Sequence, residues 1–359
     1  MKKLYTILAI AAVAAVGCAK TEVVNDNTLG NKITFQAANY THQTKAEVSI
    51  MSEFTSFKCK AFLHADGYEG ETQNLFGATG ETISAYTSAD AVTTTPSQVA
   101  YWAPSHPYYW PKSTESYVNF VAWYDKGGVD PNTATETNLV WNNYTVKTSD
   151  NLLYADEAWH YRENPSAVYK KDGTVTEGVP ILFHHALAQL CLKAKVTKAS
   201  EGNTSWDVTL ENIKINGVYN TGNLSLTNSD PSSTTHKEWT GNWTTTGEAT
   251  TINMDDVTSP LTTAETEVLA MQNVLPQELT ASNTLTLDYN ISYKYSGSEY
   301  AHEKISATIK LSDFTNSITE WAMNKKITYT LIINPETTVI KLDPAMVDWE
   351  SEDAGTYTL

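Results

Sequence analysis

The sequence predicts an all-β protein built from two domains, and three observations support this prediction. Many short segments alternate apolar and polar residues with a period of two, which is typical of strands buried on one face. Turn-forming Gly, Pro, Asn and Asp separate these segments at intervals of about 8–12 residues, as in β-sandwiches. No long stretch shows the 3.6-residue period of an amphipathic helix, which favours antiparallel sandwiches over βαβ units.

The stretch Val179–Val196 joins the two predicted halves. It begins as an apolar run, passes through His184 and His185, and ends in alternation from Leu190 to Val196. Segments rich in Thr, Tyr, Val and turn formers lie on both sides of it, and a chain of 359 residues suits two domains. We therefore expect an N-terminal β-sandwich domain over residues 32–180 and a C-terminal one over residues 181–359.

Individual strands follow from the same alternation. In the N-terminal half they are expected at Ile33–Phe35, Phe54–Phe62 and Tyr117–Tyr124. In the C-terminal half the alternating segments are, in order, Trp206–Leu210, Ile213–Tyr219, Leu224–Leu226, Val268–Leu275, Leu285–Tyr295, Ile305–Leu311, Ile327–Ile333, Val339–Leu342 and Val347–Trp349. A short turn is expected between the first two of these, and residues 227–253 are expected to form an exposed loop with room for one strand.

The first residues are a processing signal rather than part of the fold. Lys2 and Lys3 precede an apolar run that is too short to span a bilayer as a stable anchor. The run ends in Ala15-Val16-Gly17-Cys18, a sequence like a bacterial lipobox. We interpret residues 1–17 as a lipoprotein signal peptide, Cys18 as the lipidation site that anchors the protein to the outer membrane, and residues 18–31 as a polar tether.

Composition excludes several classes of function. The net charge of −17 and the presence of only one arginine, Arg162, argue against binding to nucleic acid.

The aromatic block Tyr101–Tyr124 has two interpretations: a platform for carbohydrate, or packing inside a sandwich, which we favour. With Cys18 assigned to lipid, Cys59 and Cys191 remain. A disulfide between them is an alternative, but the strand pattern around Cys191 favours two buried free thiols.

The sequence contains no pattern that indicates an enzyme, a cofactor or a metal site. The G-x-S-x-G, H-E-x-x-H, phosphate-loop and Cys-x-x-Cys motifs are all missing. His184 and His185 are the nearest approach to a metal pair, but neighbouring residues on a strand point to opposite faces. We expect one of them to be packed at the domain joint and the other to be solvated. His160, Arg162 and Glu163 are interpreted as part of a charged loop.

Seven segments taken together resemble the fimbrillins of Bacteroidetes, the type V pilins and their Mfa-like relatives. After the lipobox they are, in order, KITF at 32–35, YWP at 109–111 before YVNFVAWY, the run Phe183–Val196, IKINGVYNTGNL, VLPQEL at 274–279, and Trp321–Leu331 with a closing Val347–Trp349. Asn324 departs from the pattern, because the family usually has Gly before this Lys. Asn also adopts positive φ, so the turn is expected to survive.

The resemblance implies a surface fimbrial subunit made of two tandem transthyretin-like β-sandwiches. In that family a protease removes the N-terminal strand of the exported lipoprotein, and a strand from a neighbouring subunit fills the groove. Here the removed strand is expected around Ile33 and Phe35. Family cleavage follows a basic residue, often Arg. In this chain the candidate is Lys45, with Ala46 starting the mature chain, which argues against an Arg-specific protease. The candidate donor strand contains Val339, Ile340, Leu342, Val347 and Trp349.

The function expected from the resemblance is therefore a structural or accessory subunit of a cell-surface fimbria that supports adhesion. Its partners are expected to be other fimbrial subunits, bound by strand exchange, and the outer membrane, bound through lipid. An alternative is a surface lipoprotein adhesin or glycan-binding tip subunit, which uses exposed Tyr and Trp around 101–110 or 239–243 to bind surface glycans or proteins. A third is a base subunit that keeps its lipid and is never trimmed.

Overall fold

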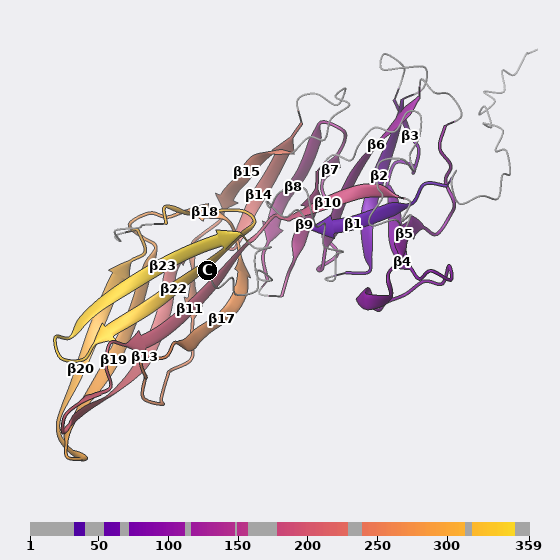
Figure 1. Ribbon diagram of the computed structural model, residues 1–359. Coiled ribbons are helices and arrows are strands. Elements are labelled where there is room, and N and C mark those ends of the chain that lie inside the picture. Colours follow the sequence, from indigo (N-terminus) through magenta and orange to yellow (C-terminus); the bar gives the residue numbers. More distant parts are fainter. Residues whose placement is uncertain are drawn as a thin grey trace, which may run out of the picture.

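The computed structural model describes residues 32–39, 54–64, 72–111, 116–147, 149–156, 178–228, 239–312 and 318–348. Within these ranges the chain forms strands β1 to β23 and one 3₁₀ turn, η2 (Pro96–Gln98), so the predicted all-β fold is confirmed. No helix in the described part is long and apolar enough to cross a membrane. The molecule is elongated, with the N-terminal strands at one end and a C-terminal sandwich at the other (Figure 1).

The N-terminal end is one sheet that closes on itself. Its strands, in spatial order, are β3 (Thr72–Asn74), β2 (Ser56–His64), β4 (Glu81–Tyr86), β5 (Tyr101–Pro104), β1 (Phe35–Asn39), β10 (Val179–His185), β9 (Leu152–Ala155) and β6 (Tyr117–Asp125). Because β2 also pairs with β6, all of these strands except β3 form a closed ring. Alternate side chains point inward and form a core rich in phenylalanine, which includes Phe57, Phe120 and Phe183.

The C-terminal end is a sandwich of two sheets. One has the order β17 (Thr266–Val274), β11 (Ala188–Val196), β22 (Lys325–Asn334) and β23 (Val339–Asp348). The other has the order β12 (Ser200–Glu201), β13 (Thr204–Val218), β19 (Thr284–Tyr295) and β20 (Ser298–Lys310), and β16 (Thr250–Asn253) also pairs with β13. A separate pair, β18 (Gln277–Glu278) and β21 (Glu320–Trp321), lies beside them. The largest apolar core among the described residues fills the space between the sheets.

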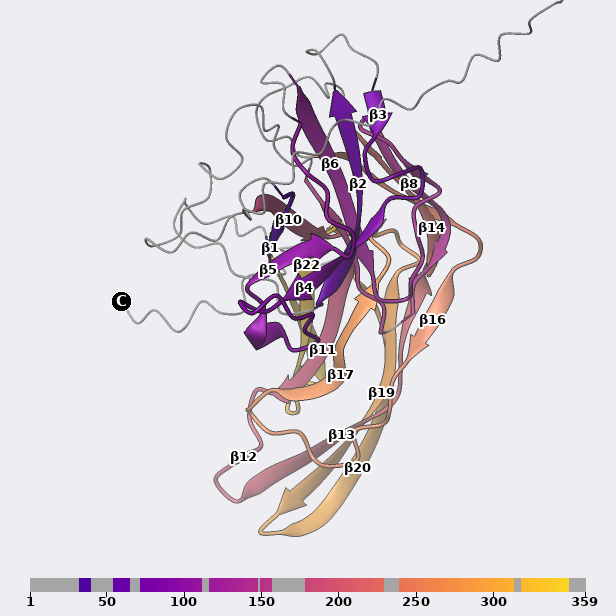
Figure 2. The same cartoon turned by 90° about the vertical axis from the view of Figure 1, so that its right-hand side faces the viewer.

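A middle sheet connects the two halves. Its order is β15 (Thr240–Thr246), β14 (Thr221–Thr227), β8 (Asn138–Thr145) and β7 (Thr133–Ala134), so a strand of the N-terminal half pairs with one of the C-terminal half. Figure 1 shows it between the closed ring and the sandwich, and Figure 2 shows the same joint from the side. A third core lies here, with Trp123, Trp141 and Trp239 among its members.

The strand pairings also bear on the domain boundary. A boundary at residues 180–181 would divide β10, which pairs with β1 and β9 in the N-terminal ring. The next strand, β11, begins at Ala188 in the C-terminal sandwich. The pairings therefore favour a boundary at Ala186 and Leu187, and we propose this refinement.

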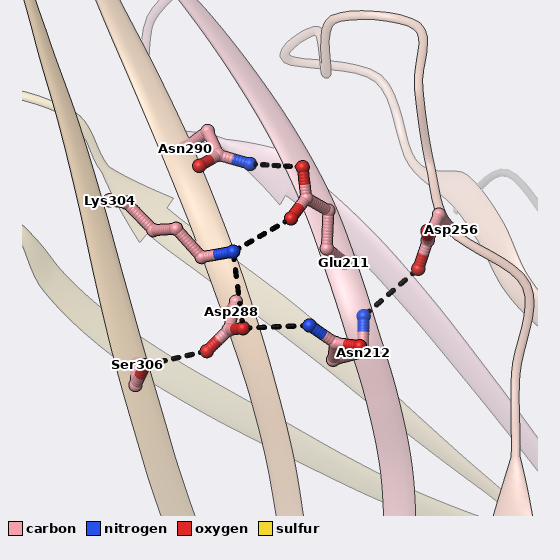
Figure 3. Close-up of polar contacts among 7 residues, drawn as sticks. All are labelled: Glu211, Asn212, Asp256, Asp288, Asn290, Lys304 and Ser306. Atoms are coloured by element: carbon pink, nitrogen blue, oxygen red, sulfur yellow. Dashed lines mark hydrogen bonds and ion pairs between the residues drawn. The ribbon is translucent and has the colours of Figure 1, made fainter.

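Three strand predictions in the C-terminal half are wrong. Val339–Leu342 and Val347–Trp349 were expected as separate strands, but β23 runs without a break from Val339 to Asp348. No turn separates Trp206–Leu210 from Ile213–Tyr219, because β13 runs through both with a bulge at Asn212, whose φ is 53°. Asn adopts this left-handed conformation more readily than most residues. Its side-chain amide donates to Asp288 and its backbone N–H to Asp256, which holds the bulge in place (Figure 3). The predicted loop 227–253 contains two strands, β15 and β16.

Candidate functional site

The first described strand, β1, occupies an interior position in the closed ring. It runs parallel to β10, with Phe35 opposite Val179 and Asn39 opposite Phe183, and it meets β5 where Phe35 is opposite Trp102. Just before the strand, the Ile33 N–H donates to the Tyr108 carbonyl oxygen at 2.8 Å. The backbone around β1 is therefore bonded to a neighbour on each side.

The side chains of this segment form part of the N-terminal core. Ile33, Phe35 and Ala37 are at most 1% exposed. The Phe35 ring makes edge-to-face contacts with Phe120, at 5.1 Å between centroids, and with Phe57, at 6.0 Å. Burial of one phenylalanine contributes about 1.5–3 kcal/mol, and such ring contacts add to it. The segment predicted from alternation thus fills the centre of the core.

Two further residues shape this site: Gly178, which sequence reasoning missed, and Tyr108, which it named only as part of the aromatic block Tyr101–Tyr124. A Cβ at Gly178 would lie 2.9 Å from the carbonyl carbon of Phe35, so only glycine lets the β1 backbone come this close to the start of β10. A single glycine just before an apolar strand is the sequence signal that could have revealed this close approach. Tyr108 packs on Phe76, and its hydroxyl donates to Glu81 at 2.7 Å. Burial, together with this hydrogen bond, raises the pKa of Tyr108 to about 12.

The predicted donor residues lie at the other end of the molecule. Val339, Ile340, Leu342 and Val347 belong to β23, which pairs antiparallel with β22 from Lys325–Asp348 to Asn334–Val339. Val339 and Val347 are each 50% exposed, whereas Ile340 packs against the C-terminal core. One chain therefore does not bring its predicted donor strand and its β1 segment together.

Further contacts hold β23 in its own sheet. Lys325 and Asp348 form an ion pair at one end of the hairpin. At the other end, the Tyr289 hydroxyl donates to the Thr338 carbonyl oxygen at 2.8 Å. Among the described strands it is the outermost member of its sheet, with a neighbour on one side only.

Several predicted residues fall outside the described ranges. These are the lipidation candidate Cys18, the cleavage candidates Lys45 and Ala46, the donor candidate Trp349, and the loop residues His160, Arg162 and Glu163. Their assignments stay predictions.

The two neighbouring histidines are both buried, so the expectation that one of them is solvated is wrong. His184 Nε2 lies 2.8 Å from an Asp156 carboxylate oxygen, and His185 Nδ1 lies 3.0 Å from the Asn151 side-chain oxygen. The joint between the two halves of the protein covers both faces of β10, so neither histidine is left in solvent. The turn at Asn324 also packs here: its φ is 60°, as predicted, and its N–H donates to the Leu187 carbonyl oxygen.

The tryptophans proposed as an exposed glycan platform are buried or half-buried. Trp239 is 6% exposed, and its indole N–H donates to the Ala155 carbonyl oxygen at 2.9 Å. Trp243 is half-buried and donates to the Ala186 carbonyl oxygen at 2.7 Å. Trp102 of the earlier aromatic block is fully buried. These side chains hold the joint and the core together, as in the packing interpretation.

The chemistry available elsewhere is limited. Cys59 and Cys191 are buried free thiols, as predicted, and burial raises the pKa of both, which leaves them poor nucleophiles. Among the described residues, no group of three or more His, Cys, Asp or Glu side chains is placed to hold a metal ion. The site with the most structural detail is one of strand pairing, and the molecule that it defines is an all-β protein of paired sheets.

Comparison with known proteins identifies the family. A family model described as fimbrillin-like matches residues 68–349, well over half of the sequence, and the chain belongs to this family. The resemblance inferred from the sequence is therefore confirmed. Members of this family are fimbrial structural and adhesion proteins, so the prediction that the chain is not an enzyme is also confirmed.

Solved structures similar to this chain include fimbrial proteins from two organisms. A fimbrial protein from Bacteroides vulgatus has 15% identity and a TM-score of 0.49, with 89% of this chain and 100% of that chain covered. The fimbrial anchor protein Mfa2 from Porphyromonas gingivalis has 11% identity and a TM-score of 0.34, with coverage of 89% and 97%. The fimbrilin fimA of the same organism has 10% identity and a TM-score of 0.36, with coverage of 89% and 98%. A comparison with curated proteins finds no match.

Proposed function

We propose that this protein is a subunit of a cell-surface fimbria, exported as a lipoprotein on Cys18 and assembled by replacing β1 with a strand from a neighbouring subunit. Membership of the fimbrillin-like family supports the fimbrial part of this proposal. One structural observation supports the exchange: β1 lies between β5 and β10 in a closed ring and supplies Phe35 to the centre of the core.

Removal of β1 would create a vacancy that only another strand fills well. The N–H and C=O groups of β5 and β10 that face it would lose their partners, and each buried unsatisfied group costs about 1–3 kcal/mol. The pockets for Ile33, Phe35 and Ala37 would also be empty. An incoming extended segment with apolar residues at alternate positions satisfies the backbone and the pockets together.

The proposed cleavage point suits this exchange. Lys45 lies in the sequence between the end of β1 at Asn39 and the start of β2 at Ser56. A cut after Lys45 separates β1 from the rest of the chain and leaves all of β2 in the mature protein. We propose Ala46 as the mature N-terminus and residues 339–359 as the donor segment. Other fimbrial subunits would then be its partners at the cell surface, and lipid on Cys18 would hold the precursor at the outer membrane.

The mature N-terminus is the first measurement to make. Intact mass and N-terminal sequencing of protein taken from the cell surface should give a chain that starts at Ala46. Lys45→Ala should abolish this trimming, whereas Lys32→Ala, the matched control on the other side of β1, should leave it unchanged. A chain that still begins at acylated Cys18 would contradict the exchange and favour a permanently anchored base subunit.

Truncation after Thr338 tests the donor role. This change removes β23 and everything after it, and it leaves β22 as the new sheet edge. We expect a monomer that stays folded by near-ultraviolet circular dichroism and fails to polymerise by electron microscopy. Loss of the folded signal would show that β23 serves the fold of its own subunit, which would count against a donor role.

A further inference from the structure

Exposed strands at sheet ends normally carry features that prevent pairing with another chain, such as charges, proline or bulges. Four strands of seven or more residues occupy end positions in the described sheets: β15, β17, β20 and β23. The other described end strands, β3, β7, β12, β18 and β21, have two or three residues, and β16 has four. A short strand can form only a few backbone hydrogen bonds with a partner. The four long strands therefore decide where another strand can bind.

Of these four, β20 is protected by charge. Its central residue, Lys304, is paired with Glu211 at 2.9 Å and with Asp288 at 3.4 Å across the outer face of the sandwich (Figure 3). Pairing β20 with itself about its centre would place Lys304 opposite a second Lys304. Glu303 and Lys310 add further charges along the same edge. Like charges directly opposite one another destabilise a pair of strands.

The strands β23 and β17 are protected differently. β23 has Asp343 and Pro344 at its centre, and proline has no N–H for a ladder. β17 carries Glu267, and its register with β11 shifts on both sides of Leu192. A strand with such irregularities is a poor template for regular pairing.

β15 has none of these features. Its sequence, Thr-Gly-Asn-Trp-Thr-Thr-Thr from Thr240 to Thr246, contains no charged residue and no proline, in a protein with a net charge of −17. Its register with β14 is unbroken along its whole length. Figure 1 shows β15 at the outer margin of the middle sheet, and Thr240, Asn242 and Thr244 are exposed. Of the four long end strands in the described part of the chain, it is the one without charge, proline or a register shift.

We propose that β15 pairs antiparallel with β15 of a second copy of this chain, which joins two middle sheets into one continuous sheet across a two-fold axis. Any antiparallel register of β15 against itself sets only Thr, Asn, Gly and Trp opposite one another. The same pairs already stabilise the β14–β15 ladder, where Thr221 faces Thr246 and the Thr240 hydroxyl donates to the Thr227 carbonyl oxygen at 3.1 Å.

Electrostatics favours β15 over the other sheet edges as the place where two copies of the chain meet. Two chains of net charge −17 repel each other over most of their surfaces, and an uncharged strip is where they approach at the least electrostatic cost. The contact is isologous, so it closes at two copies, unlike strand exchange, which continues along a filament. In a fimbria assembled by exchange, such a contact would join filaments or subunits side by side.

Light scattering after size-exclusion chromatography tests the proposal on residues 19–359, which contain every described strand. We expect a concentration-dependent dimer. Asn242→Lys combined with Thr244→Lys should weaken dimerisation at least about tenfold, because lysines then face lysines across the axis. Ser225→Lys is the matched control: Ser225 is exposed opposite Asn242, but on the interior strand β14, so this variant should still dimerise. Equal unfolding midpoints of all three proteins would show that their folds are intact.

Three results would overturn the proposal. One is a monomer at every concentration reached, and another is a dimer that the two lysines leave unchanged. The third is growth beyond two copies, which indicates strand exchange. A second readout uses Asn242→Cys with a short bis-maleimide linker, which should give covalent dimers, whereas Ser306→Cys on β20 should not. The native Cys59 and Cys191 stay unmodified because both are buried.

Discussion

The two strands that the proposed assembly depends on, β1 and β23, are held in opposite ways. β1 is interior, with β10 on one side and β5 on the other, and its apolar side chains are buried in the N-terminal core. β23 stands at a sheet end, pairs with β22 alone among the described strands, and exposes half of Val339 and of Val347. The loss of an interior strand leaves a vacancy with two open edges, whereas the release of an end strand breaks one ladder. This difference supports the proposal that β1 is the strand to be replaced and β23 the segment to be released.

The largest effect on the free energy of unfolding is expected at Phe35, the core side chain of β1. Phe35→Ala removes the ring that meets Phe57 and Phe120, and it should lower the free energy of unfolding by about 3–5 kcal/mol. Val347→Ala on β23 should change it by less than about 0.5 kcal/mol, because that side chain is half exposed. Urea denaturation of both variants measures the difference, and similar costs would refute the contrast.

Gly178→Ala tests the close approach of β1 to β10. Its Cβ would overlap the Phe35 backbone, so we expect a cost of about 1–3 kcal/mol. The loss should be local: hydrogen exchange measured by mass spectrometry should speed up in residues 32–39 and stay unchanged in residues 339–348. Equal acceleration in both segments would indicate general destabilisation, and the special role of Gly178 would then be wrong.

Tyr108→Phe removes the hydrogen bond to Glu81 beside β1 and should cost about 1 kcal/mol at pH 8. The folded pKa of Tyr108, about 12, is above the unfolded value of about 10. The stabilisation is therefore complete below pH 10 and disappears as the pH rises towards 12. Urea midpoints of wild type and variant should differ at pH 8 and converge at pH 11. Tyr300→Phe, at an exposed position on β20, is the control and should show no such convergence.

The smallest effect is expected at the end of β23. Lys325→Ala removes a partly exposed ion pair with Asp348, which should contribute only about 0.2–1 kcal/mol. A double-mutant cycle with Asp348→Asn measures the coupling energy of this ion pair. High salt should reduce that energy. A coupling energy of several kcal/mol would mean that β23 is locked in place, which would weaken the proposal that it can be released.

Much of the strand content was available from local pattern. The alternation Leu285–Tyr295 corresponds to β19, and Ile327–Ile333 lies within β22. Ile33 and Phe35 were named from the same alternation and from the family resemblance, and both are core residues. Such predictions succeed because the period of two depends only on neighbouring residues and on which face is buried.

What failed depended on contacts between distant parts of the chain. Trp239 lies in a Thr-rich stretch that reads as a loop, yet it is buried against the end of β9 through Ala155. The bulge at Asn212 is held by Asp256 and Asp288, which no local pattern places beside it. Gly178 owes its role to the backbone of Phe35, far away in the sequence.

The sequence by itself determined that the protein is all-β and which faces of its strands are apolar, and its charge argues against binding to nucleic acid. Only the tertiary structure decided that the N-terminal sheet closes into a ring with β1 inside it, that β8 crosses to β14, and that β15 is left as an uncharged edge. The physical reason is that alternation selects a strand and its buried face, whereas the choice of neighbour depends on loop closure and side-chain packing between segments distant in the sequence.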